Sequence, residues 1–226
     1  KVTMPENVHS VFITGGTGYM GSRLVAMLAK RGHTVRALIR HASAQKLPAG
    51  AQPVLGDALS SDYIQQVRPS DTFIHLVGVS HPSPAKAAEF RSVDLVALRH
   101  AVNAAVAAKV RHFVYVSVAH PAHLMKAYIE VRQECETIIR NSGLNATILR
   151  PWYVLGPGHR WPYALLPAYW LMEHIPATRE AALRLGLVTL PQILNALLAA
   201  VERPCQRTRF WDVQAIRSHT SPKSGK

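Results

Sequence analysis

The fold is decided by residues 11–21, which read VFITGGTGYMG. The first three positions form an apolar run typical of a buried strand, and the segment after the glycines repeats apolar residues at helical spacing. Gly16 is expected to permit the tight turn out of the strand, Gly18 to let backbone N–H groups approach a pyrophosphate, and Gly21 to let the helix pack closely against the sheet. The phosphates would lie at the positive end of that helix. The residues expected to form this dinucleotide site are Thr14, Gly15, Gly16, Thr17, Gly18, Tyr19, Met20 and Gly21.

Length and composition favour one large folded domain. The chain has 226 residues, of which 48% are hydrophobic and 17% charged, so it is long and apolar enough to bury a core. Cys135 and Cys205 are too few and too far apart for a disulfide framework or a zinc cluster, which favours a reducing, cytoplasmic location. The first seven residues lack the apolar core of a signal peptide, so no targeting segment is expected.

The formal net charge of +13 bears on partners. It would suit nucleic acid or an anionic membrane, and equally a phosphate-rich cofactor. Because the charges are spread along the chain, apart from a basic cluster within residues 30–40 and the tail, a solvated basic surface is favoured and nucleic-acid binding is not expected. Apolar stretches at 164–172 and 181–201 are too short or too interrupted to span a membrane, but docking of this region on a membrane or a partner subunit stays open.

Short β-branched runs alternate with longer helical patterns, which predicts an α/β fold with a doubly wound parallel sheet of the Rossmann type. Strands are expected at about 9–14, 34–39, 53–56, 72–77, 112–117 and 145–149. Helices are expected at about 18–31, 60–67, 85–108, 123–141 and 191–202. The dinucleotide-binding core would occupy residues 1–150. Residues 151–218 would form a small helical and irregular C-terminal lobe that covers the site, and residues 219–226 a flexible tail.

The end of the second strand bears on the choice of cofactor. NAD sites usually place a carboxylate there to accept hydrogen bonds from the adenosine ribose, and this chain has none. Arg40 follows the strand instead, where its guanidinium would grip a ribose 2′-phosphate with help from Arg36 or Ser43, unless it is only a solvated charge. NADP(H) is therefore favoured over NAD(H). Gly56 and Asp57 are expected near the adenine, although Asp57 could instead start a turn or cap a helix.

Further motifs follow the glycine turn in a fixed order. They are Gly56-Asp57, HLVGV at 75–79, VYVS at 114–117, the segment 128–132 and LRP at 149–151. Together they resemble the short-chain dehydrogenase/reductase superfamily, in particular its extended and atypical NAD(P)-binding members related to nucleoside-diphosphate-sugar epimerases, over roughly residues 8–160. The resemblance implies that Leu76, Val77 and Gly78 line the adenosine side of the cofactor and that Pro151 approaches the nicotinamide.

The resemblance also implies a catalytic set. In that family a tyrosine exchanges a proton with a substrate oxygen while hydride passes to or from the nicotinamide, beside a serine and a lysine. Ser117 and Tyr128 match the serine and the tyrosine. The lysine normally holds the nicotinamide ribose and lowers the pKa of the tyrosine, but its position is Arg132 here, which keeps the charge on a larger planar head and can still bond the ribose. Asp94 is a second departure, since an asparagine often lies in this helix.

Two smaller groups of residues lie near the same site. Aromatic and basic side chains after the last predicted strand are expected in a substrate wall, where they could stack on a ring or an isoprenoid unless they only pack the lobe. They are Trp152, Tyr153, His159, Arg160, Trp161 and Tyr163. His120 and His123 have no acidic or cysteine partner in sequence, so no metal site is expected.

These features favour an NADP(H)-binding oxidoreductase or epimerase acting on a small carbonyl or hydroxyl compound. The alternative is a non-catalytic cofactor-binding module. A glycine motif that persists beside an altered active-site set, here at Arg132, resembles the atypical branch of the family, which includes NmrA-like redox sensors, isoflavone-type reductases and the accessory subunit of respiratory complex I. A nucleotide-sugar epimerase is less favoured, since the C-terminal region is short for a nucleoside diphosphate. The expected partners are a small-molecule substrate and, by analogy, a second copy paired through the helices at 85–108 and 123–141.

Overall fold

The computed structural model describes residues 8–79, 82–122, 125–157 and 184–219. Its main sheet contains strands β1 (Ser10–Thr14), β2 (Thr34–Ile39), β3 (Ala51–Leu55), β4 (Thr72–His75), β5 (His112–Val116), β6 (Ala146–Leu149) and β9 (Thr208–Trp211). All seven are parallel and lie in the order β3-β2-β1-β4-β5-β6-β9. The predicted doubly wound Rossmann-type fold is confirmed. The order reverses at β1, and such a switch point is where ligands bind in this fold class.

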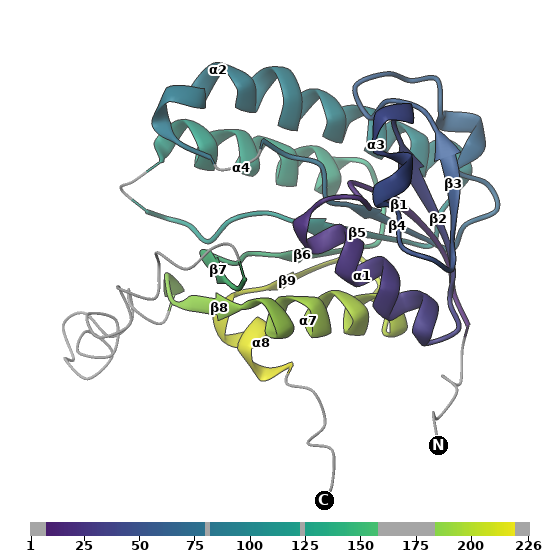
Figure 1. Cartoon of the computed structure of the whole chain (residues 1–226). Helices are drawn as coiled ribbons and strands as arrows, with labels where there is room; N and C mark the ends of the chain where they lie inside the picture. Colours follow the sequence, from purple (N-terminus) through teal and green to yellow (C-terminus); the bar gives the residue numbers. More distant parts are fainter. Residues whose placement is uncertain (1–7, 80–81, 123–124, 158–183, 220–226) are drawn as a thin grey trace, which may run out of the picture.

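Helices cover both faces of the sheet (Figure 1). One face carries α1 (Tyr19–Lys30), α7 (Leu190–Glu202) and α8 (Val213–Ser218). The other carries α2 (Ala87–Glu89), α3 (Val96–Ala108) and α4 (Lys126–Asn141). Strand β1 is fully buried and serves both sides, because Val11 and Ile13 pack with the α1 and α7 layer while Phe12 packs with the α3 and α4 layer. A β-strand covered on both faces reads as an unbroken apolar run, as this one does.

Two expected helices differ from the prediction. Residues 60–67 hold only a short 3-10 turn, η2 (Ile64–Gln66), which is flanked by the buried side chains of Tyr63 and Val67. Residues 85–108 do not form one regular helix. A 3-10 turn η3 (Pro84–Lys86) and α2 lead into a π-helical segment η4 (Phe90–Leu95), and α3 follows. Such π-segments are frequent at functional sites.

The C-terminal part of the chain contributes to the core. Strand β9 extends the main sheet beside β6, and α7 packs in the same hydrophobic cluster as α1. The sequence analysis did not predict β9, nor the small parallel sheet of β7 (Tyr153–Leu155) and β8 (Leu187–Thr189). Helix α7 begins where expected, with Pro191 in its first turn and a capping box between Thr189 and Gln192.

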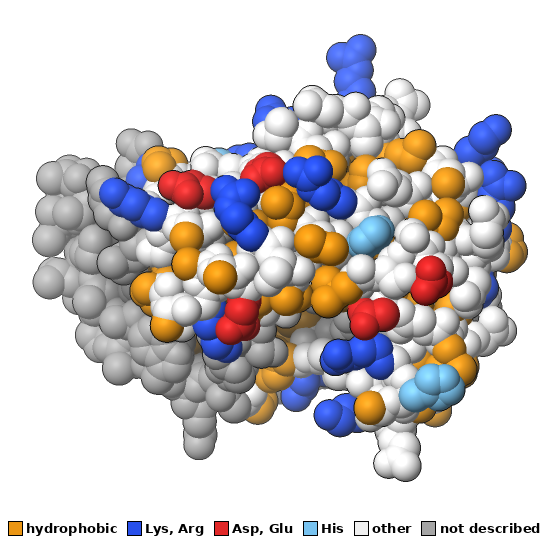
Figure 2. Space-filling model, turned by 90° about the horizontal axis from the view of Figure 1, so that it is seen from above, with side chains coloured by type: hydrophobic (Ala, Val, Ile, Leu, Met, Phe, Trp, Pro, Cys, Tyr) orange, Lys and Arg blue, Asp and Glu red, His pale blue; other side chains and the backbone are white. Residues whose placement is uncertain are grey.

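Figure 2 looks down on the layer of α2, α3 and α4, where basic and acidic side chains are interspersed among apolar ones. Glu134 on α4, for example, lies 3.1 Å from both Arg91 and Arg99. The net positive charge is therefore not gathered into one basic patch on this face. No helix in the described ranges combines the length and the apolar character needed to cross a membrane.

Candidate functional site

The glycine turn lies against the end of strand β4. Gly15 has the left-handed φ of +79°, and a Cβ there would stand 2.7 Å from the carbonyl carbon of Leu76. The N–H of Gly18 donates to the carbonyl of Gly15 at 3.0 Å, which closes the turn. A Cβ on Gly21 would overlap that same carbonyl oxygen. The tight turn thus depends on Gly15, whereas Gly16 packs toward Ile13 and Ala37 in the core.

The two long helices on this side of the sheet begin differently. At the start of helix α7 the side chain of Thr189 accepts from the N–H of Gln192. No side chain caps the N-terminus of α1, where Gly18 is the N-cap residue. The first N–H groups of a helix have no partner within the helix and carry a partial positive charge. At α1 they are directed to the mouth of the glycine turn, so the turn can accept a diphosphate.

A cavity of about 440 Å³ opens where β1, β4, β5 and β6 end. Most of the predicted site residues line it, namely Gly15, Gly18, Tyr19, Met20, Gly21, Leu76, Val77, Gly78, Ser117, Tyr128, Arg132 and Pro151. The fold therefore brings the glycine turn and the expected catalytic side chains to one cavity. The predicted residues that do not line this cavity are Thr14, Gly16, Thr17, Arg40, Gly56 and Asp57.

Buried polar contacts support the floor of the site below the glycine turn. The hydroxyl of Thr14 lies 2.8 Å from Nδ1 of His75, and the His75 ring stacks on that of Tyr115 at 6.0 Å between centroids. Burial, aided by the charge of Arg132, lowers the pKa of His75 to about 3. His75 is therefore neutral at physiological pH and fixes strand β4 beside β1 without adding charge to the site.

Ser117 follows β5 and faces the cavity. Its N–H donates to the carbonyl of Leu149 at 2.7 Å, which continues the pairing of β5 with β6 past the end of the strand. The side chain is almost fully buried, and its hydroxyl has no hydrogen-bond partner among the described residues. A buried hydroxyl without a partner is costly, and a ligand oxygen in the cavity would satisfy it.

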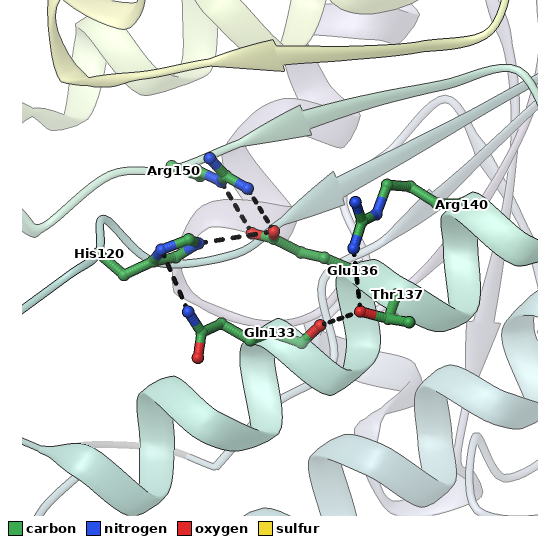
Figure 3. Close-up of polar contacts among 6 residues, drawn as sticks. All are labelled: His120, Gln133, Glu136, Thr137, Arg140 and Arg150. Atoms are coloured by element: carbon green, nitrogen blue, oxygen red, sulfur yellow. Dashed lines mark hydrogen bonds and ion pairs between the residues drawn. The ribbon is translucent and has the colours of Figure 1, made fainter.

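The loops after β5 and β6 are tied to helix α4 by a polar cluster (Figure 3). Arg150 donates from Nε and Nη2 to the two carboxylate oxygens of Glu136, which lies on α4. His120 lies 3.6 Å from the same carboxylate and 3.3 Å from the side-chain amide of Gln133. Pro151 next to Arg150 accepts a 2.8 Å hydrogen bond from the N–H of Ala119. The cluster thus fixes the loops that carry Ser117 and Pro151.

Tyr128 lies in the first turns of α4 and lines the cavity. Its ring makes an edge contact with Phe90, with centroids 5.0 Å apart, and the guanidinium of Arg132 lies 4.9 Å from the ring centroid. Burial raises the pKa of Tyr128, the charge and a hydrogen bond of Arg132 oppose that rise, and the charge of Asp94 adds to it. Arg132 therefore favours release of the Tyr128 proton, as the family lysine does for its tyrosine.

Arg132 is itself buried and held by three partners. Its Nη1 donates to the hydroxyl of Tyr115 at 2.9 Å and to the carbonyl of Val116 at 3.0 Å, and its Nη2 donates to Oδ1 of Asp94 at 2.8 Å. Burial alone would lower the pKa of Arg132, but the neighbouring tyrosines and Asp94 hold it well above its ordinary value. The guanidinium stays charged and forms a buried ion pair with Asp94.

The residues expected at the adenosine end stand apart from the cavity. Arg40 is exposed at the end of β2, before the 3-10 turn η1 (His41–Lys46). Arg36 donates to the carbonyls of Val67 and Arg68, so it holds the chain before β4 and does not assist Arg40. Asp57 accepts from the N–H of Leu59 at 3.0 Å, which is the turn contact considered as its alternative.

Sequence reasoning missed several side chains of the cavity wall. Val79, Pro82, Val118 and Met125 line it. Val79 ends the HLVGV motif but was not assigned to the site, and nothing in the residue types or spacing of the other three signals one. Trp152 and Tyr153 line it as expected. The other members of the predicted aromatic wall, His159, Arg160, Trp161 and Tyr163, lie outside the described residues, as does His123.

Residues 15–162 match the model of a family described as NAD(P)H-binding. Solved structures of low sequence identity share its fold. The Bordetella bronchiseptica enzyme WbmH in complex with NAD+ superposes with a TM-score of 0.68 at 20% identity, over 91% of this chain and 75% of the other. MoeE5 with UDP-glucose and NAD also gives 0.68, at 19% identity, over 92% of this chain and 80% of the other.

Curated relatives are more varied in their names. A farnesyl-dihydroquinoline-oxide ketoreductase of Stigmatella aurantiaca is 35% identical over 47% of this chain and 32% of its own length. The ceramide reductase of Caulobacter vibrioides is 28% identical over 66% of this chain and 47% of its own. The photosystem II assembly factor Ycf39 of Cyanophora paradoxa is 26% identical over 62% and 44%. The matched regions thus cover less than half the length of these three relatives.

Proposed function

Because the chain belongs to the NAD(P)H-binding family, we propose that it binds NADP(H) and acts as an oxidoreductase on a small apolar carbonyl or hydroxyl compound. The observation that carries this proposal is the shared cavity. The glycine turn, which can hold a diphosphate, lines the same cavity as Ser117 and Tyr128, the two hydroxyl-bearing residues of the expected catalytic set. A cofactor held by the turn would therefore extend toward two groups that can polarise a carbonyl.

The two hydroxyls would have separate tasks. Ser117 would donate a hydrogen bond to the carbonyl oxygen of the substrate, because its hydroxyl has no partner among the described residues. Tyr128 would give its proton to that oxygen in reduction and recover it in oxidation, helped by the positive charge of Arg132. When bound, the nicotinamide would supply or accept the hydride.

The lining favours an apolar substrate. Beyond the glycine turn, the wall consists of apolar and aromatic side chains, among them Val79, Pro82, Met125 and Trp152. Arg132 is the one cationic side chain among the described residues of this wall, and Asp94 neutralises it. Relatives named for a farnesylated quinoline and for ceramide support the same choice. A nucleotide sugar, as bound in the structure of MoeE5, is less well matched.

A panel assay tests this function. Purified protein with NADPH is offered apolar ketones and aldehydes, and with NADP+ the corresponding alcohols, while the absorbance of NADPH is followed. We expect turnover with members of the panel, and a loss of about a hundredfold or more in Tyr128→Phe with NADPH affinity retained. Tyr63→Phe is the control for removal of a buried phenol hydroxyl, since Tyr63 does not line the cavity and its hydroxyl has no partner among the described residues. Full activity in Tyr128→Phe would contradict the proposed mechanism.

A second function is a cofactor-binding module without turnover. One support is that Arg132 is held in an ion pair with Asp94, so the position of the family lysine has no mobile cation. The other is the likeness to assembly factors such as Ycf39. Tight NADPH binding with no turnover across the whole panel would support this function. Its partner would be a membrane-associated or regulatory protein or a second copy of this chain, and co-purification from the source cell would test for it.

A further inference from the structure

Three of the five N–H groups of the Arg132 guanidinium donate to acceptors inside the protein. Both N–H groups of Nη1 have acceptors, Tyr115 and Val116, and Nη2 has Asp94. Nε has no partner among the described residues, but it is buried. Tyr128 lies over one side of the guanidinium at 4.9 Å and Tyr115 at 5.5 Å. Turning the guanidinium toward a ligand in the cavity would break these three bonds.

Asp94 holds this arrangement from a different element. It lies on η4, where its carboxylate also accepts from the N–H of Val79, with Oδ1 at 3.2 Å. A Cβ on Gly78 would stand 2.6 Å from both Nη2 of Arg132 and Oδ1 of Asp94, so the ion pair lies directly beneath the backbone that follows β4. Asp94 thus connects η4, α4 and the cavity wall at Gly78 and Val79.

We propose that Asp94 and Arg132 are a matched pair of positioning residues, in which Asp94 fixes Arg132 against Tyr128 and withdraws it from the ribose of the cofactor. The inference rests on the proposed function, because it assigns roles within that site. An arginine is needed because its planar fork reaches Asp94, Val116 and Tyr115 at once, which the single ammonium of a lysine cannot do. An aspartate is needed because a buried guanidinium requires a compensating charge. Asp94 and Arg132, the two departures from the family pattern, are then a single coordinated change, because each residue needs the other.

The pair predicts opposite effects of its members on Tyr128. The groups around the two side chains are Asp94 from η4, Tyr115 from β5, His75 from β4 and Cys135 from α4. Removing the charge of Asp94 leaves the cation unopposed, so the pKa of Tyr128 should fall. Removing the charge of Arg132 should raise it. A role confined to stability would lower the melting temperature in both variants without shifts of opposite sign.

The test places a ring-fluorinated tyrosine at position 128 and follows its ¹⁹F NMR signal with pH. Ring fluorination makes the phenol more acidic than that of tyrosine, so position 128 titrates closer to the pH range in which the protein stays folded. The variants are Asp94→Asn, Arg132→Gln and the double variant, a neutral amide pair that keeps a test available if either single variant fails to fold. We expect a lower pKa in Asp94→Asn, a higher one in Arg132→Gln, and an intermediate one in the double variant. Glu134→Gln is the matched control, because it removes an exposed ion-pair carboxylate from the same helix.

NADPH affinity provides the second arm, measured by the fluorescence of the nicotinamide. Because Arg132 is withdrawn from the ribose, we expect the Kd for NADPH to change by less than about threefold in Arg132→Gln. A rise of about tenfold or more, or an unshifted ¹⁹F titration in every variant, would overturn the inference. Absence of NADPH binding in the wild-type protein would instead contradict the proposed function, while the ¹⁹F titration would still report on the pair.

Discussion

Nη2 of Arg132 lies 2.8 Å from Oδ1 of Asp94, and both side chains are buried. In sequence these residues are 38 positions apart, on α4 and η4. A buried ion pair of this kind adds little stability compared with an apolar pair of the same volume, but loss of one partner leaves a charge without compensation in a medium of low polarity. The pair is therefore better explained by its place beside Tyr128 than by stability.

Asp94→Ala should lower the free energy of unfolding by about 3–5 kcal/mol, because it leaves the guanidinium of Arg132 buried and unpaired. The double variant Asp94→Leu/Arg132→Met should lose less, since it removes both charges. Urea unfolding followed by circular dichroism measures both values. A double variant less stable than Asp94→Ala would show that the hydrogen bonds of Arg132 to Tyr115 and Val116 outweigh the cost of its burial.

Gly21→Ala should weaken cofactor binding strongly. The new Cβ would overlap the carbonyl of Gly15, so the glycine turn must move away from α1. We expect the Kd for NADPH to rise by at least about tenfold in a fluorescence titration. Gly143→Ala is the control, because Gly143 has a φ of +77° with no atom within 4 Å of the added Cβ. That change should cost only about 1–2 kcal/mol of backbone strain and leave the Kd unchanged.

The stability of the protein should fall as the pH drops below about 6.5, partly because of His75. Its pKa is about 3 in the folded protein, so the unfolded chain binds a proton at a pH where the folded chain does not. Well below pH 6.5 this costs about 1.4 kcal/mol per pH unit, until the folded protein is protonated as well. His75→Asn keeps a polar atom for Thr14 and should flatten the dependence of unfolding free energy on pH between about 6 and 4. An equal flattening in His41→Asn, at an exposed site, would contradict the assignment to His75.

Local signals in the sequence were sufficient for six of the seven strands of the main sheet and for the glycine turn. Strand β1 and α1 are predicted because apolar runs and glycines act over a few residues. Strand β9 was missed because its sequence, TRFW, contains no run of buried apolar residues. Thr208, Arg209 and Trp211 are half-buried, and Phe210 is exposed. Its place is set by pairing with β6, more than fifty residues earlier, and no local pattern reports such pairing.

The site was predictable in part for the same reason. Spacing along one helix placed Tyr128 and Arg132 together, and both line the cavity. The role of Asp94 could not be predicted, since its contact with Arg132 depends on how η4 packs against α4. The sequence indicated only that both residue types were unusual for the family. Their ion pair is the basis of our proposal that the two departures compensate each other.

Arg40 decides the preference for NADPH if the proposal on the cofactor is right. Its side chain is exposed and follows β2, where a 2′-phosphate on the adenosine ribose would be reached. Paired charge-assisted hydrogen bonds contribute about 1.5–3 kcal/mol, so Arg40→Ala should weaken NADPH binding by about ten- to a hundredfold and leave NADH binding nearly unchanged. Lys46→Ala, at the other end of η1, controls for the general effect of a positive charge. Fluorescence titration of the wild-type protein and the two variants with both coenzymes gives six affinities. All are measured at one fixed ionic strength, because salt screens the attraction between these basic side chains and the phosphates of the coenzyme. Equal affinity of the wild-type protein for NADPH and NADH, or an equal loss of NADPH affinity in Lys46→Ala, would remove Arg40 from the site and the preference with it.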